Sequence, residues 1–132
     1  MSLITVDLRD RKQLYEQLID NIKALILSGD LKRDDKLPSV RSLAKELGIN
    51  PNTIQKAYTE LERCGIIVSM PGRGSMVLAE RDSLRDEMSG KLENAMAALA
   101  REMRESGIGR EEFVRAAEEA WDRMGGNQND QN

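Results

Sequence analysis

The sequence predicts a mainly α-helical protein with one small β-hairpin. Apolar residues recur with a period of about 3.6 residues over most of the 132-residue chain, which is the spacing of one helix face. Only one Phe, one Trp and two Tyr are present, so the core must be aliphatic, which suits packed helices better than a large sheet. A single Pro/Gly-rich turn between two β-prone runs supplies the clearest signal for strands.

The composition removes several classes of function. The chain has one Cys and no His, so it offers no disulfide framework, no His-based zinc site and no Ser/His or Cys/His nucleophile pair. We therefore expect no enzyme, no catalytic residues, no metal site and no cofactor. The N-terminus lacks a basic segment followed by an apolar one, and no apolar run approaches about 18 residues, so we expect a cytoplasmic protein without a membrane partner.

The chain begins with a short extended segment and a scaffold helix. Residues 3–8 contain β-branched residues in partial alternation, enough for one short strand or an extended arm. A helical period follows from about Lys12 and stops at Ser28 and Gly29. Residues 30–38 are charged, lack periodicity and end in a proline, which predicts a loop.

Two short helices joined by a tight turn follow this loop. Ser39 is placed to cap a helix that carries an apolar stripe and ends at Gly48. Asn50 can cap the next helix, and Pro51 suits its first turn. Because few residues separate the two helices and the join contains Gly, the pattern predicts a helix-turn-helix.

The second of these helices, which stops at Gly65, divides into two faces. Its inner face repeats apolar residues at helical spacing from Ile54 to Leu61. Its outer face carries side chains that donate and accept hydrogen bonds, as contacts with base edges and phosphates require. This predicts a DNA recognition helix, although an ordinary surface helix has a polar outer face as well. The outer residues are Asn52, Thr53, Gln55, Lys56, Thr59 and Arg63.

A β-hairpin is predicted directly after the helix-turn-helix, in the place of a wing. Two β-prone runs, 66–70 and 75–78, flank the turn Pro71-Gly72-Arg73-Gly74. Glycine lets the backbone approach a ligand closely, so Arg73 is positioned to enter a minor groove or to clamp a phosphate. A cradle for a nucleotide phosphate is the alternative, but it needs a following helix and a longer Gly spacing.

The net charge of −3 conceals a split along the chain. Residues 1–79 hold 12 Lys and Arg against 10 Asp and Glu, whereas residues 80–132 hold 8 against 13. Within residues 36–79 the count is 6 basic against 3 acidic. The field around the predicted recognition helix is therefore positive, although the whole chain is acidic.

Two further helices are predicted, at about 82–105 and 110–124. Their apolar stripes are more than two helices alone can cover, which predicts a homodimer, with packing back onto the same chain as the alternative. We expect a DNA-binding domain at 1–79, a helical dimerisation region at 80–126 and a disordered tail at 127–132. The expected dimer interface consists of Leu92, Met96, Leu99, Met103, Phe113 and Trp121.

The order of these elements, together with one long motif, resembles the GntR family of bacterial transcription regulators. The motif starts with Leu37-Pro38-Ser39-Val40-Arg41, keeps its spacing through Asn50-Pro51-Asn52-Thr53 and is followed by the Gly-rich turn. The similarity covers about residues 13–78 and implies a winged helix-turn-helix that binds double-stranded DNA. The DNA contacts implied at matching positions are Arg41, Asn50, Asn52, Thr53, Gln55, Lys56, Gly72 and Arg73.

Two features refine what the resemblance implies. Some relatives read a base with an Arg at the position of Pro51, so sequence reading is expected to shift onto Asn52, Gln55 and Lys56. The short C-terminal region resembles the YtrA-like subfamily, whose members pair through such helices and commonly repress operons encoding ABC transporters. We therefore expect a homodimeric repressor that binds a palindromic operator, with a helical protein-interaction adaptor built on a winged-helix fold as the alternative.

Cys64 invites interpretation as a redox switch. It lies at the end of the predicted recognition helix without a second cysteine, so we expect a small packing residue instead. The sequence identifies neither the operator nor a small-molecule effector.

Overall fold

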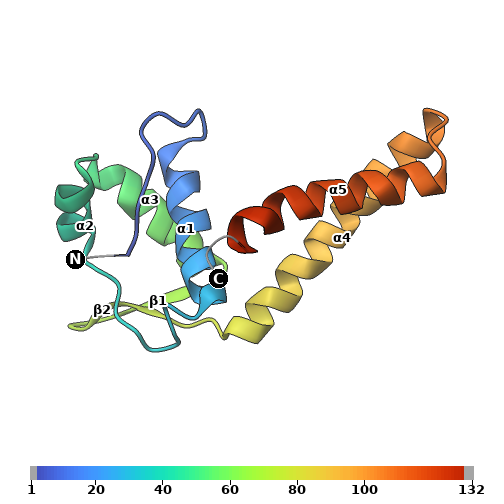
Figure 1. The fold of residues 1–132 in the computed structure, drawn as a ribbon. Helices are drawn as coiled ribbons and strands as arrows, with labels where there is room; N and C mark the ends of the chain where they lie inside the picture. Colours follow the sequence, from blue (N-terminus) through green and yellow to red (C-terminus); the bar gives the residue numbers. More distant parts are fainter. Residues whose placement is uncertain (1–2, 130–132) are drawn as a thin grey trace. The chain divides into compact units, whose positions relative to one another are not determined.

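Figure 1 shows the chain in a computed structural model that describes residues 3–129. The chain divides into two compact units, the first ending at Glu87 and the second beginning at Met88. The mainly α-helical class with a small β wing is confirmed. In chain order the elements are α1 (Leu14–Ser28), α2 (Val40–Leu47), α3 (Pro51–Arg63), β1 (Ile67–Met70), β2 (Gly74–Val77), α4 (Arg81–Glu105) and α5 (Arg110–Asn129).

The core of the first unit is aliphatic, as the sequence predicts. α1 and α2 both pack against α3, and β1 contacts α3 as well. Tyr58 is the aromatic member of this core, and among the side chains described in residues 3–125 no polar or charged residue is buried. The largest fully buried side chains are Leu18, Ile22, Ile26, Leu43, Ile54, Leu61, Ile67 and Val77.

The turn between α2 and α3 follows from its capping residues. The Ser39 hydroxyl accepts a hydrogen bond from the Ser42 N–H at 3.1 Å, which satisfies one of the first N–H groups of α2. Gly48 ends α2 in the left-handed conformation, with φ of 69°. The chain can therefore reverse direction and begin α3 at Pro51, which gives the helix-turn-helix.

Tyr58 ties α3 to the segment that precedes α2. Its hydroxyl donates a 2.7 Å hydrogen bond to the carbonyl oxygen of Pro38. Burial raises the pKa of Tyr58, so the hydroxyl keeps its proton and remains a donor. The contact fixes the recognition helix relative to the start of α2 through a partly buried bond.

The wing is a two-stranded antiparallel hairpin. Ile67 pairs with Val77 at one end and Met70 with Gly74 at the other. Residues 34–37 of the preceding loop also lie along β2, where the Leu37 N–H donates to the carbonyl oxygen of Ser75 at 2.9 Å. Part of the predicted loop therefore covers the outer edge of the hairpin, which leaves fewer unpaired backbone groups there.

Residues 3–8 form an extended arm and not a strand. Ile4 is buried, and polar side chains of α1 hold the backbone that follows it. The Thr5 N–H donates to Asn21 at 2.9 Å, and the Asp7 N–H donates to Gln17 at 2.8 Å. These amide side chains satisfy the backbone groups that a neighbouring strand would otherwise pair.

The first turns of α4 belong to the first unit, so the boundary lies further along the chain than the position after residue 79 that the sequence indicated. Leu84 is buried with 3% of its surface exposed. Arg81 Nε donates to the carbonyl oxygen of Leu27 at 2.7 Å, and Arg33 pairs with Glu80 at 2.8 Å. The sequence after residue 79 is mostly charged and does not predict that the start of α4 packs on the first unit. The buried contact there is supplied by one apolar residue, Leu84.

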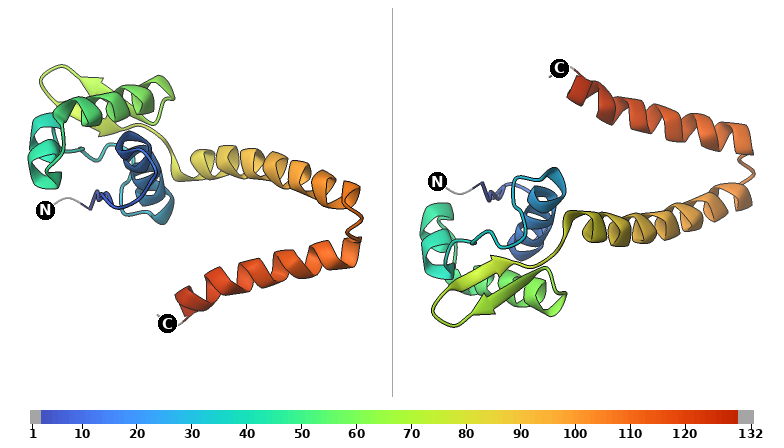
Figure 2. Two further views of the ribbon diagram at one scale, coloured as in Figure 1. Left: turned by 90° about the horizontal axis from the view of Figure 1, so that it is seen from above. Right: turned by 90° about the horizontal axis from the view of Figure 1, so that it is seen from below.

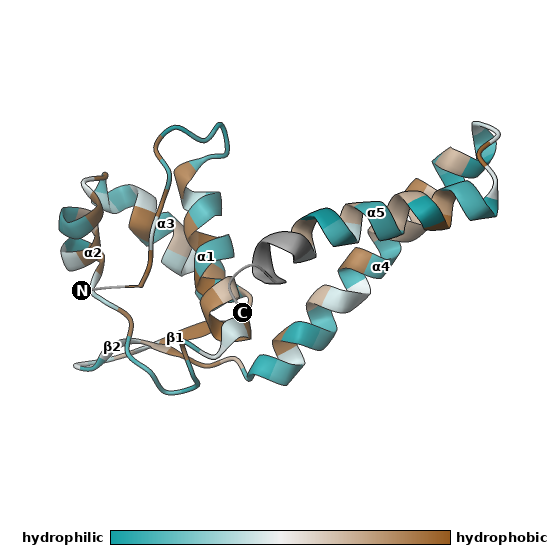
Figure 3. Cartoon of the chain, in the orientation of Figure 1, coloured by the Kyte–Doolittle hydropathy of each residue, from teal (hydrophilic) through white to brown (hydrophobic). Residues whose placement is uncertain are grey.

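The second unit consists of α4 from Met88 onward and α5, joined by a tight turn (Figure 2). The Ile108 N–H donates to the carbonyl oxygen of Met103 at 2.9 Å, which closes the end of α4. Met103, Ile108 and Phe113 line a hollow of about 470 Å³ at this turn. Apolar residues recur along both helices (Figure 3), yet none of the side chains described between residues 88 and 125 is buried.

α5 is longer than predicted and runs to Asn129. The expected disordered tail at 127–132 therefore gives way to helix at residues 127–129, and residues 130–132 lie outside the described residues. Each residue added to the end of a helix gains a backbone hydrogen bond, so a helix can continue past its last apolar side chain. Within residues 3–129, no helix combines the length and apolar character needed to cross a membrane.

Candidate nucleic-acid interface

The outer face of α3 has the division of side chains that the sequence predicts. Asn52, Gln55, Lys56 and Thr59 are exposed, whereas Thr53 is half-buried. The opposite face is buried from Ile54 to Leu61. A ligand that meets this helix from outside therefore encounters amide, hydroxyl and ammonium groups held over a packed core.

Asn50 has a structural role at the start of α3. Its Oδ1 accepts a hydrogen bond from the Asn52 N–H at 2.8 Å and caps the helix. Only the side-chain NH₂ of Asn50 can then donate to a ligand. The group of residues expected in the groove thus contains one residue whose side-chain oxygen is already engaged.

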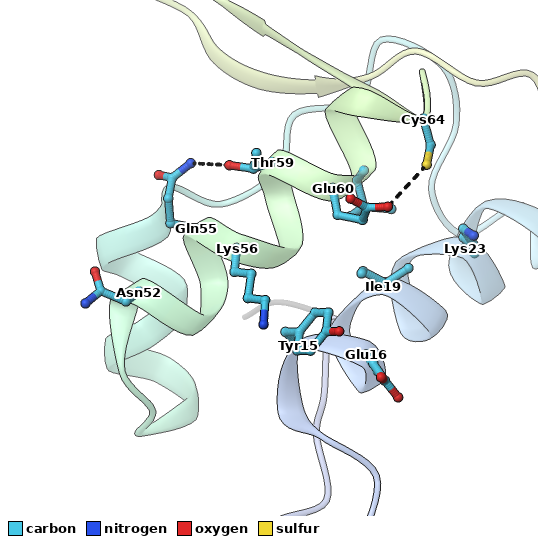
Figure 4. Close-up of a pocket in the computed structure, with 11 residues that line it drawn as sticks. Tyr15, Glu16, Ile19, Lys23, Asn52, Gln55, Lys56, Thr59, Glu60 and Cys64 are labelled. Carbon is cyan, nitrogen blue, oxygen red and sulfur yellow. Dashed lines mark hydrogen bonds between the residues drawn. The ribbon is translucent and has the colours of Figure 1, made fainter.

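Gln55 is held by its neighbour one turn along. Its Nε2 donates to Thr59 Oγ1 at 3.1 Å, and Figure 4 shows Gln55 and Asn52 pointing away from α1. The bond fixes the orientation of the Gln55 amide. Its carbonyl oxygen and second N–H form the donor and acceptor pair that matches the edge of adenine in the major groove.

Lys56 points in the other direction, towards α1 (Figure 4). Its Nζ lies 3.8 Å from the centroid of the Tyr15 ring, the geometry of a cation–π contact. Tyr15 stands in the first turn of α1 and is half-buried. Lys56 and Gln55 are neighbours in sequence, yet they occupy opposite sides of the exposed face.

At the end of α3, the positive charge of Arg63 is paired with the carboxylate of Glu60. Arg63 donates to the Glu60 carboxylate at 2.5 and 3.0 Å, and this contact lowers the pKa of Glu60. Cys64 follows and is exposed, with its Sγ 3.8 Å from Glu60 Oε1. The expectation of a packing role for Cys64 is therefore wrong, because the helix ends at this residue and its side chain faces outward.

The remaining predicted contacts lie on α2 and on the wing. Arg41 is exposed on α2. Gly72 and Arg73 are exposed at the tip of the hairpin, where Gly72 has φ of 76° and the Arg73 N–H donates to the carbonyl oxygen of Met70 at 2.9 Å. The tip is a tight turn that presents the Arg73 side chain without a role in the core.

Two contributors to this surface were not identified from the sequence. Tyr15 falls within the helical period that begins at about Lys12, but spacing alone does not show which helices meet. Glu62 accepts a 2.8 Å hydrogen bond from the Ser69 N–H and so ties the end of α3 to the wing. A carboxylate seven residues before the backbone N–H that it accepts from carries no sequence signal for such a contact.

Comparison with known proteins places these features among bacterial regulators. Residues 14–77 match the family described as bacterial regulatory proteins, gntR family. The chain is 51% identical over 75 residues to the HTH-type transcriptional repressor YtrA of Bacillus subtilis (strain 168), an alignment covering 57% of this chain and 58% of that protein. The chain thus spans less than two thirds of the length of that relative.

Two further proteins are similar over most of their length. The uncharacterised HTH-type transcriptional regulator YhcF of Bacillus subtilis (strain 168) is 38% identical over 104 residues, which cover 78% of this chain and 85% of that protein. The structure of a GntR family transcriptional regulator from Listeria monocytogenes is 33% identical with a TM-score of 0.68, and the match covers 83% of this chain and 96% of that one.

Proposed function

Because the chain belongs to the GntR family of DNA-binding transcription regulators, we propose that it is a homodimeric repressor that binds a palindromic operator. The observation that carries the proposal is the outer face of α3, which presents exposed polar side chains above a fully packed apolar face. A helix of this kind fits the major groove, where base edges offer donors and acceptors.

The contacts divide between sequence reading and anchoring. Asn52 and Gln55, which point away from α1, meet base edges in this proposal. Thr53 and Arg41 contact the backbone or, for Arg41, a guanine. Arg73 at the wing tip enters the minor groove or contacts a phosphate, and Gly72 lets the backbone approach it. The excess of basic residues between 36 and 79 supports these contacts.

Pairing through α4 and α5 explains the apolar residues of the second unit. Leu92, Met96 and Leu99 on α4 are each more than half exposed, and Trp121 on α5 is 78% exposed. Met103 and Phe113, at the turn between the helices, are only half-buried. Contiguous apolar surface of this kind is costly in water, and a second copy of the same helices would cover it.

A dimer also supplies the surface that tight binding needs. One recognition helix covers a few base pairs, whereas two related by a two-fold axis read half-sites about 10 base pairs apart. The Bacillus subtilis relative YtrA is named as a transcriptional repressor, which supports repression as the regulatory effect of this chain. By resemblance to the YtrA-like subfamily, the regulated genes in this proposal encode an ABC transporter, and the protein acts in the cytoplasm.

Selection of bound fragments from a random duplex library tests the proposal. We expect an inverted repeat among the selected fragments, and binding that weakens steeply as the salt concentration rises. Sedimentation of the full chain at micromolar concentration should give a dimer. Failure to bind any duplex at low salt would refute the repressor function and favour a winged-helix adaptor that contacts another protein.

A further inference from the structure

The contact between Tyr15 and Lys56 joins the scaffold helix to the recognition helix on the exposed surface. The Lys56 ammonium lies over the aromatic ring at 3.8 Å from its centroid. Tyr15 is half-buried in the first turn of α1, and α1 packs against α3, so its ring has less conformational freedom than a fully exposed side chain. A lysine on an exposed helix face normally samples many rotamers, and this ring restricts them.

Glu60, the carboxylate one turn after Lys56, is engaged by another residue. A hollow between α1 and α3 is lined by Glu16, Lys23 and Glu60 in addition to Tyr15 and Lys56. Glu60 lies one turn after Lys56, where it would be a natural ion-pair partner, but its carboxylate accepts both hydrogen bonds from Arg63. The Glu60 carboxylate is thus engaged by Arg63, which makes it less available as an ion-pair partner for Lys56.

The direction of Lys56 separates it from the base-reading residues. Figure 4 shows Asn52 and Gln55 on the side of α3 away from α1, and Lys56 on the side that faces α1. When a recognition helix lies in the major groove, its outward side meets the base edges and its flanks face the sugar-phosphate walls, while the preceding helices cross the backbone. The flank next to α1 is therefore a position for a phosphate contact.

We propose that Tyr15 is a positioning residue that holds Lys56 on the flank of α3, where Lys56 contacts a DNA phosphate and reads no base. The proposal rests on the proposed function and changes one expectation from the sequence, because base reading then rests on Asn52 and Gln55 without Lys56. Restricting the lysine in the free protein lowers the conformational entropy that is lost when it contacts the phosphate.

Three variants of the full-length protein test this role. Lys56→Met removes the charge and keeps a similar unbranched side chain, Tyr15→Leu removes the ring, and Tyr15→Phe keeps the ring without the hydroxyl. Binding is measured at several salt concentrations to a duplex selected with the wild-type protein, to its single-base variants and to an unrelated duplex. Circular dichroism confirms that each variant keeps its helices.

The expected results follow from a phosphate contact positioned by a ring. Lys56→Met should weaken binding to all duplexes by a similar factor and reduce the slope of log K against log salt by about one for each copy of the chain. Tyr15→Leu should weaken binding about two- to fivefold per copy, Tyr15→Phe should behave like the wild type, and Tyr15→Leu should have no further effect in the Lys56→Met background.

Each contrary result has a distinct meaning. A changed base preference in Lys56→Met would overturn the phosphate assignment. An equal loss from Tyr15→Leu with and without Lys56, or a loss from Tyr15→Phe as large as that from Tyr15→Leu, would overturn the positioning role. If the wild-type protein binds no duplex, the proposed function fails and this inference fails with it, whereas binding without coupling between Tyr15 and Lys56 overturns the inference alone.

Discussion

Removing the start of α4 should destabilise the first unit, although this helix was expected to serve only dimerisation. A fragment ending at residue 79 lacks Leu84, of which 3% is exposed, and the hydrogen bond from Arg81 to the carbonyl oxygen of Leu27. Burying a leucine side chain contributes about 2–3 kcal/mol. An exposed hydrogen bond adds about 1 kcal/mol, and the exposed pair of Arg33 and Glu80 should add little.

The assay is urea unfolding of fragments 1–79 and 1–87, followed by circular dichroism. The longer fragment should have a free energy of unfolding about 3 kcal/mol higher, measured at equal concentration. Leu84→Ala in fragment 1–87 should remove about 2–4 kcal/mol, because it leaves a cavity in addition to losing buried surface. Leu78→Ala is the matched control, since Leu78 is 39% exposed and should cost much less. Equal stability of the two fragments would refute the assignment of these residues to the first unit.

Arg73→Ala should weaken DNA binding by about 1–3 kcal/mol with unchanged thermal unfolding, and unchanged affinity at moderate salt would contradict the wing contact. Gln55→Ala should relax the preference among operator variants, whereas Arg41→Ala should weaken all of them together; coinciding profiles across a panel of single-base changes would refute this division. Leu99→Asp should leave an unpaired charge in the proposed dimer interface, so sedimentation should show monomers that bind single half-sites. Tyr58→Phe should lower the free energy of unfolding by about 1–2 kcal/mol, because it leaves the carbonyl oxygen of Pro38 without this donor; no change in urea unfolding would show that water replaces it.

The sequence predicted the parts of the fold that depend on local signals. Capping residues and left-handed glycines act over a few residues, which is why the limits of α2 and the start of α3 agree with those predicted from Ser39, Gly48 and Asn50. The hairpin was found for the same reason, since its turn carries its own glycines. The division of α3 into two faces follows from helical periodicity alone.

Contacts between distant segments were beyond the reach of such signals. The contact between Lys56 and Tyr15 joins residues on different helices, and neither residue type predicts the presence of the other. The bond from Arg81 to Leu27 spans 54 positions in the chain. Periodicity can say that a residue faces inward or outward, but the direction of an outward side chain depends on which helix lies beside it.

The second unit has too little core of its own to fold as an independent pair of helices. From Met88 to residue 125, none of the described side chains is buried, and the half-buried residues Met103, Ile108 and Phe113 lie at the turn. Isolated helices gain little stability in water without a packed apolar face. Pairing of two copies would supply that face, so in the proposed dimer the folding of this unit and the association of the chains are coupled. It follows that dilution should unfold α5 before it affects the winged unit, whose core is complete within one chain.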